Sequence, residues 1–220
     1  MRKATLARLS SIVLLMTLLW PAMATDFNNA LDFSLTLQNQ TQMFRYESQT
    51  RTVNTQIMEL AWQEQLASYL TGSVRLGYLT ESQPQHPTPE LISCAGQYLG
   101  IKLRSPLQLT TTQNVYLGFE YIYAASQNVN APTFNRNWNR TELGIGWHWQ
   151  ALPQVGLQVS QHYQHQAGID STSSTAFPFS MTEGSFYSAQ LLLAIDKGQI
   201  NLSGFYGGLT GGSIEFQHRF

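Results

Sequence analysis

Charged residues are scarce in this sequence. Only 11% of its 220 residues are Asp, Glu, Lys or Arg, well below the roughly 25% usual for soluble domains. The 12 basic and 13 acidic residues nearly balance. Because nucleic-acid binding relies on a clustered excess of basic residues, we expect no nucleic-acid partner.

Cysteine and long apolar runs are also scarce. Cys94 is the single cysteine, which excludes an internal disulfide, and we predict that it is a small side chain in a strand. Hydrophobic residues make up 43% of the chain. The mean hydropathy is nevertheless -0.19, because Gln, Asn, Ser and Thr are interspersed among them. This pattern excludes a bundle of membrane helices, each of which needs about 20 consecutive apolar residues.

One apolar run lies near the N-terminus, at residues 12–20. Basic residues precede it, and a small-residue A-x-A motif that ends at Ala24 follows it. These are the three parts of a secretory signal peptide. We therefore predict a signal peptide at 1–24 and one mature domain at 25–220.

The last eight residues alternate between apolar and polar side chains. Successive side chains of a strand point to opposite faces, so this stretch predicts a strand with one apolar face. The polar parity holds Glu215, Gln217 and Arg219, and the other parity holds Ile214, Phe216, His218 and the terminal Phe220.

Nine further segments alternate in the same way. Most are at least as long as the 9–11 residues that a tilted membrane strand needs. We therefore predict ten strands, at about residues 31–45, 55–63, 68–80, 92–104, 111–124, 137–150, 154–165, 185–195, 199–206 and 213–220.

The charged residues inside these segments share one parity, which is opposite to the apolar one. A charge facing lipid costs roughly 2–4 kcal/mol near the midplane of a bilayer, which is enough to enforce such sorting. We predict a charge network in the lumen of a barrel, made of five acids and five bases: Asp32, Glu59, Arg75, Lys102, Arg104, Glu120, Arg140, Glu142, Glu215 and Arg219.

The aromatic residues on the apolar parity are sorted by height along the strands. Amphipathic rings prefer the two interfaces between membrane and water, so we predict two aromatic belts. One belt lies near the short turns and holds Trp62, Trp147, Trp149 and Phe220; the other lies near the longer loops and holds Tyr78, Tyr121, Tyr123, Tyr163 and Tyr187.

The alternating segments and the terminal Phe220 together resemble bacterial outer-membrane β-barrels of the outer membrane protein A and opacity type. The resemblance implies an all-β chain that forms a closed, antiparallel, up-and-down transmembrane barrel in the outer membrane. It also implies two partners, which are the lipids of that membrane and the barrel-assembly machinery that reads the terminal strand. Closure has a physical reason, because lipid cannot satisfy the polar groups of an open sheet edge.

Two alternatives to a ten-stranded barrel remain at this point. The barrel has eight strands if the segment at 55–63 or the short one at 199–206 is a loop. An exported soluble all-β protein also explains alternation, but it explains neither the two belts nor the terminal Phe220.

The connections alternate between short turns and longer polar loops, with the longer loops after the first, third, fifth and seventh strands. The longest, 167–184, holds Phe177, Phe179 and Met181. These apolar residues either contact a surface ligand or fold over the barrel mouth. We expect a structural or surface-interaction role for a barrel whose lumen is largely filled by side chains. The alternatives are a narrow passive channel and a barrel lipid hydrolase.

The hydrolase alternative depends on Ser160 and His162, which share the inward parity, with His148 on the preceding strand. A serine and a histidine can form a nucleophile and its base. However, the sequence identifies no third, orienting carboxylate, and a strand is expected to hold the two side chains parallel. We therefore expect no enzymatic activity, and we also expect no cofactor and no metal, since His162 and His165 fall on opposite faces.

Overall fold

The computed structural model describes residues 31–47, 49–83, 92–130 and 133–219. Within these ranges no helix has the length and apolar character needed to cross a membrane. The predicted signal peptide at 1–24 and the terminal Phe220 lie outside the described residues. The described chain forms one sheet of eleven strands: β1 (Leu31–Tyr46), β2 (Gln49–Ala67), β3 (Leu70–Gln83), β4 (Ile92–Gln108), β5 (Gln113–Asn128), β6 (Asn135–Leu152), β7 (Val155–Ser171), β8 (Ala176–Met181), β9 (Ser185–Ile195), β10 (Gly198–Gly207) and β11 (Leu209–Arg219).

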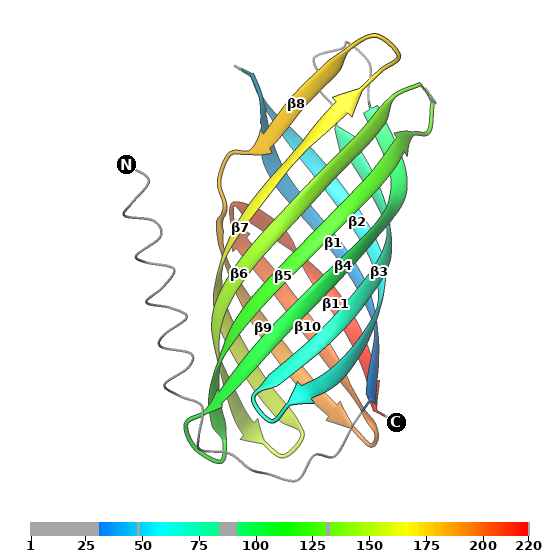
Figure 1. Cartoon of the computed structure of the whole chain (residues 1–220). Coiled ribbons are helices and arrows are strands. Elements are labelled where there is room, and N and C mark those ends of the chain that lie inside the picture. Colours follow the sequence, from blue (N-terminus) through cyan, green and yellow to red (C-terminus); the bar gives the residue numbers. More distant parts are fainter. Residues whose placement is uncertain (1–30, 48, 84–91, 131–132, 220) are drawn as a thin grey trace.

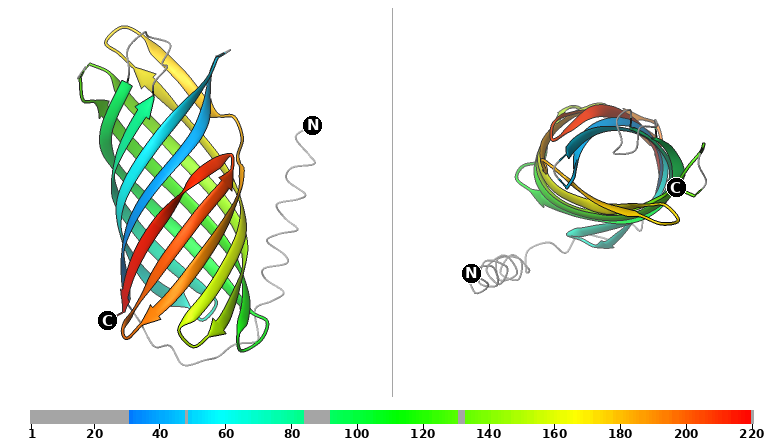
Figure 2. Two further views of the ribbon diagram at one scale, coloured as in Figure 1. Left: turned by 180° about the vertical axis from the view of Figure 1, so that it is seen from behind. Right: turned by 90° about the horizontal axis from the view of Figure 1, so that it is seen from above.

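Ten of these strands close into an antiparallel up-and-down barrel (Figure 1, Figure 2). The closing pair is β1 with β11, which runs from Asp32 opposite Arg219 to Gln42 opposite Leu209. Each of the other barrel strands pairs with its neighbours, so the barrel has no free edge along this stretch. The predicted all-β, ten-stranded closed barrel is confirmed.

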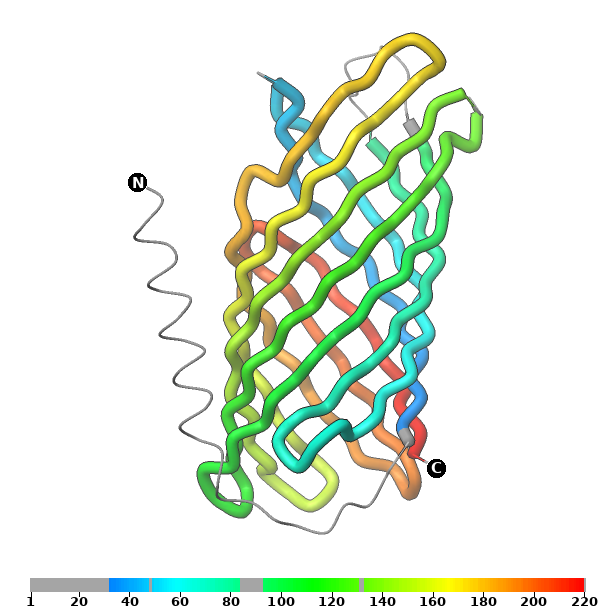
Figure 3. Tube along the Cα trace, in the orientation of Figure 1, coloured from blue at the N-terminus to red at the C-terminus, as the bar shows by residue number. Residues whose placement is uncertain are grey.

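The eleventh strand, β8, changes the strand number along the barrel axis. The strands β9, β10 and β11 are short, and Figure 2 shows them ending well below the tops of the others. Above them β8 pairs with β7 on one side and with Phe44 to Tyr46 of β1 on the other. Figure 3 traces this return of the chain along β7 (yellow to gold). The outer end therefore consists of eight strands, β1 to β8, which leave an interior only wide enough for side chains.

The exterior apolar band is shorter than the strands. On the outward face of β2, Leu60 is 63% exposed and Met58 53% exposed, and the next outward residues are polar. Gln56 of β2, Asn39 of β1 and Thr80 of β3 mark this change of character. We call the part beyond it the outer extension, made of the described residues within 39–56, 80–97, 124–139 and 164–184. We take the apolar band as the membrane-spanning part of the strands and the outer extension as the part outside it.

Two predicted loops belong to this extension and are wrong as predicted. The connection after the first strand is a tight turn at Glu47 (φ 49°), because β2 begins at Gln49 rather than near residue 55. Most of 167–184 is the end of β7 and the strand β8. Where a strand faces water instead of lipid, its outward side chains need not be apolar. The alternation of apolar and polar residues is therefore lost there, although the strand continues.

Candidate functional site in the barrel lumen

A polar cavity of about 660 Å³ occupies the lumen between the chain-end rim and the middle of the barrel. Asp196 and Lys197 of the β9–β10 turn line it at that rim. Short turns mark the periplasmic side of outer-membrane barrels, and we refer to the rim with the short turns as the periplasmic rim. All ten predicted network charges line this lumen cavity: Asp32, Glu59, Arg75, Lys102, Arg104, Glu120, Arg140, Glu142, Glu215 and Arg219.

Four of these charges form a layer of ion pairs across the lumen. Arg75 pairs with both Glu59 and Glu120, and Arg140 pairs with Glu120. Tyr98 adds a hydrogen bond to Glu59. Two cations thus face two anions, which suits a buried site, because an unpaired buried charge is strongly destabilising.

The remaining network charges are spread along the cavity wall. Arg104 donates to Gln158 at 2.7 Å, and its guanidinium carbon lies 3.8 Å from the ring centroid of Tyr116. Near the rim, Arg219 pairs with Asp32 at 3.1 Å. Asn201 donates to Glu215 at 3.1 Å. Lys102 stands opposite Glu120 in the register of β4 and β5.

Glu142 takes part in a different arrangement, with Ser160 and His162. The Ser160 Oγ lies 2.8 Å from the His162 Nε2, and the His162 Nδ1 lies 2.8 Å from the Glu142 Oε1. The Ser188 Oγ of β9 is 2.6 Å from the Ser160 Oγ and 3.4 Å from the His162 Nε2. We call Glu142, Ser160, His162 and Ser188 the serine–histidine–glutamate cluster. It lines the lumen cavity.

The imidazole of His162 is confined on both sides. Gly144 stands opposite His162 in the β6–β7 register, and a Cβ at Gly144 would lie only 2.8 Å from the His162 Nδ1. The other contact is Phe186, whose ring stacks on the imidazole with centroids 4.6 Å apart and planes 7° apart. A glycine thus gives the ring room, and an aromatic side chain keeps it in place.

Two expectations about this cluster are wrong. A carboxylate does orient the histidine, because Glu142 lies on the neighbouring strand, diagonal to His162. The side chains of Ser160 and His162 also converge rather than remaining parallel, because Gly144 leaves space for the ring to turn. Neither fact is visible without the strand register. His148 does not join the cluster and instead contacts Asn114 at 3.0 Å.

An apolar cluster fills the lumen above the ion pairs. Sequence periodicity predicted a polar inward face and therefore missed this cluster. The signal for it was that apolar residues occur on both faces of β2, β3 and β6, rather than on the outward face alone. We call these residues the apolar plug: Phe44, Tyr46, Val53, Ile57, Leu79, Tyr98, Ile122, Ala124, Trp138 and Phe179.

A buried polar group closes the outer end above the plug. Arg136 donates two hydrogen bonds of 2.7 Å to Asp170 and one of 2.8 Å each to Tyr46 and Gln83. Burial lowers the pKa of the Arg136 guanidinium, but its carboxylate partners outweigh this and raise it. Burial also raises the pKa of Tyr46 and, against the opposing field of Arg136, the pKa of Glu81.

The predicted belt residues that are described lie on the exterior. Trp62 stacks on Phe33 with ring centroids 6.1 Å apart, and Trp147 stacks on Trp149 at 6.4 Å. The tyrosines lie toward the outer edge of the apolar band and are 40–59% exposed: Tyr78, Tyr121, Tyr123, Tyr163 and Tyr187. Their contact with lipid headgroups stays a prediction.

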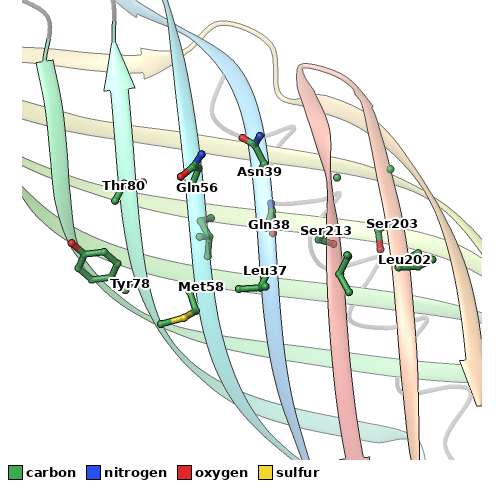
Figure 4. A pocket seen from close by; sticks show the side chains of 14 residues that line it. Leu37, Gln38, Asn39, Gln56, Met58, Tyr78, Thr80, Leu202, Ser203 and Ser213 are labelled. Carbon is green, nitrogen blue, oxygen red and sulfur yellow. The ribbon is translucent and has the colours of Figure 1, made fainter. Parts of the chain in front are cut away.

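The outer wall also carries a groove of about 930 Å³ (Figure 4). Leu37, Met58 and Leu202 line it beside two glycines, Gly204 and Gly212, which leave a depression between larger neighbours. The groove opens on the exterior apolar band. Within the described ranges, no group of three or more His, Cys, Asp and Glu side chains is placed to hold a metal ion.

No family model and no curated protein matches this sequence. Solved structures match in fold. An outer-membrane channel from Pseudomonas putida F1 superposes with a TM-score of 0.53 at 10% identity, over 91% of this chain and 99% of that one. The translocator domain of an autotransporter from Neisseria meningitidis superposes with a TM-score of 0.50 at 8% identity, over 99% of this chain and 98% of that one. The chain is therefore similar in fold to bacterial outer-membrane β-barrels.

Proposed function

We propose, from the premise that this chain folds as a bacterial outer-membrane β-barrel, that it is a non-conducting barrel whose role lies at its outer surface. The lipids of the outer membrane surround its apolar band. The barrel-assembly machinery inserts it by reading the terminal strand. The outer extension then presents a fixed surface outside the membrane.

The filled outer end carries this proposal. Eight strands enclose the apolar plug, in which Phe44 is 1% and Trp138 4% exposed. Above it Arg136 and Asp170 are 1% and 0% exposed at their side chains. A passive channel needs a continuous polar path, and these two layers favour a closed barrel over that alternative.

The hairpin of β7 and β8 is the part of the extension that we assign to surface contact. Phe179 points inward and is 4% exposed, and Phe177 and Met181 pack against the plug. The apolar residues of 167–184 thus favour folding over the barrel mouth. The exposed tip at 173–175 is polar, so a surface ligand of the hairpin would contact Ser and Thr hydroxyls.

Planar-bilayer recordings of the purified protein test the closed barrel. The wild type should show no steady single-channel openings. The double variant Trp138→Ala, Phe179→Ala removes two aromatic rings of the plug and should conduct intermittently. Trp147→Ala removes an exterior ring and is the matched control, which should stay silent. Steady openings of the wild type would support the narrow-channel alternative instead.

A further inference from the structure

The proposed surface role leaves the serine–histidine–glutamate cluster unused. We propose that this cluster is a hydrolytic site, in which Ser160 attacks short acyl esters of polar alcohols that enter the lumen cavity from the periplasmic rim.

The three side chains occupy the positions that nucleophilic catalysis requires. The Ser160 Oγ and the His162 Nε2 are 2.8 Å apart, within the hydrogen-bond reach of a nucleophile and its base. The carboxylate of Glu142 accepts from the His162 Nδ1 at 2.8 Å. That bond keeps the proton on Nδ1 and leaves the Nε2 lone pair directed at the serine, the tautomer that such a base needs.

The surroundings hold this geometry in place. The imidazole lies against Phe186 on one side and above the bare backbone of Gly144 on the other. The side chains of His162 and Glu142 are 17% and 15% exposed, so the site reaches the cavity without being open to bulk water. Partial burial of this kind strengthens the pairing of a base with its orienting carboxylate.

Ser188 supplies a hydrogen-bond donor for the oxyanion of the reaction, which the backbone at this site cannot supply. Backbone N–H groups commonly stabilise the oxyanion of acyl transfer, but here β7 and β9 pair through Ser160 and Ser188, and the ladder uses those groups. The Ser188 Oγ lies 2.6 Å from the Ser160 Oγ. Its hydroxyl is therefore the donor that we assign to the developing oxyanion.

The reaction balances with water as the only co-reactant. The Ser160 Oγ forms a bond to the ester carbonyl carbon while the His162 Nε2 takes the hydroxyl proton. The bond to the alcohol oxygen then breaks, and the imidazolium returns the proton to that oxygen. A water molecule next attacks the acyl-serine, with Nε2 as its base. This step releases the carboxylic acid and restores the Ser160 hydroxyl.

The lumen cavity selects the class of ester. Its wall carries charged groups of both signs, such as Lys102 and Glu215, which favour a polar alcohol and disfavour a long acyl chain. A groove of about 820 Å³ on the outer wall also includes Ser160 and Ser188 among its lining residues. Their hydroxyls nevertheless bond to His162 on the lumen side. A membrane lipid in that groove would contact the outward side of β7 and β9 and would not reach these hydroxyls, which argues against the lipid-hydrolase alternative.

Covalent labelling of the full chain in detergent micelles tests the nucleophile. A fluorophosphonate probe should modify folded wild-type protein, and mass spectrometry should place the adduct on Ser160. Ser160→Ala should abolish the adduct. Ser126→Ala is the matched control, because Ser126 is also 7% exposed and is bonded to a carboxylate at 3.2 Å, but lies in the outer extension. It should label like the wild type.

The histidine and glutamate variants test the relay. His162→Gln should lower the labelling rate about a hundredfold or more, as expected for the loss of a general base. Glu142→Gln should lower the maximal rate without changing the probe concentration for half-maximal labelling, and Glu142→Asp should partly restore that rate. A merely structural role of Glu142 would instead reduce the folded fraction, which a gel-shift assay on unboiled samples measures separately.

Substrate preference tests the class of ester. The wild type should hydrolyse p-nitrophenyl acetate faster than p-nitrophenyl palmitate. The proposed hydrolytic site is refuted if folded wild-type protein forms no adduct, or if His162→Gln leaves the labelling rate unchanged. An adduct on Ser188 that survives Ser160→Ala overturns the assignment of the nucleophile. A preference for palmitate overturns the substrate class. All these readouts are independent of conductance.

Discussion

The buried Arg136 group predicts a large difference between two superficially similar arginine substitutions. Arg136 and Arg219 each pair with an aspartate of the inner wall, Asp170 and Asp32 respectively. The Arg136 side chain is 1% exposed, whereas the Arg219 side chain is 67% exposed. We compare Arg136→Gln with Arg219→Gln, since both remove one charge from a strand end.

The expected loss of unfolding free energy in each variant depends on the groups that the substitution leaves without their arginine partner. Arg136→Gln removes four hydrogen bonds. It leaves Asp170 buried near Glu81 without the arginine, although the hydrogen bond from Tyr46 at 2.9 Å remains. Breaking a buried pair in this way costs about 3–5 kcal/mol. Arg219→Gln leaves Asp32 with its hydrogen bond from Gln217 at 2.9 Å. Because water screens the exposed pair, its loss costs about 0–1 kcal/mol.

Urea unfolding in detergent micelles measures the two differences, with tryptophan fluorescence as the signal. Amide hydrogen exchange in β1 and β8 shows whether the outer extension opens before the membrane-spanning part. We expect faster exchange there in Arg136→Gln and unchanged exchange in Arg219→Gln. Equal losses of unfolding free energy in the two variants would refute the reasoning from burial.

Two further predictions concern titratable groups of the outer extension. Burial raises the pKa of the Cys94 thiol to about 12, and the thiolate is the reactive form. Iodoacetamide at about pH 8 should therefore modify Cys94 in urea but not in the folded protein. Equal rates of modification in the two states would contradict the burial of Cys94. Burial raises the pKa of Glu81, so the folded form favours its protonated state. Its contribution to stability is thus present below the ordinary pKa of about 4.3 and is lost as the pH rises through the raised pKa. Glu81→Gln should flatten this decline in the urea midpoint, whereas an unchanged pH profile would assign the decline to another group.

Much of the barrel could be predicted from local periodicity. Periodicity places the charges of the apolar-band strands, such as Arg75 and Glu120, in the lumen, because a charge that faces lipid is destabilising. The strand count followed from the same alternation. The strands of the outer extension could not be predicted as well. Outward residues such as Gln56 and Asn54 face water there, so no requirement for an apolar outward face produces an alternating pattern.

The candidate site shows a different limit. Ser160 and His162 were visible as two inward residues on one strand, and Glu142 was visible as one lumen charge. Their association depends on which residue of β6 stands beside which residue of β7, and on the absence of a side chain at Gly144. Register between strands is a long-range property that local periodicity does not contain.

The sequence by itself determined the alternation, the sorting of charges and aromatics, and hence a closed barrel with an apolar exterior, because each depends on the solvent that one residue meets. Only the tertiary structure decided that eight strands enclose the outer end and ten the inner one, since β8 replaces β9, β10 and β11 by pairing with the distant β1. The same closure separates the plugged outer end from the polar cavity. The register of β6 against β7 places His162 within hydrogen-bond distance of both Glu142 and Ser160, at the wall of that cavity.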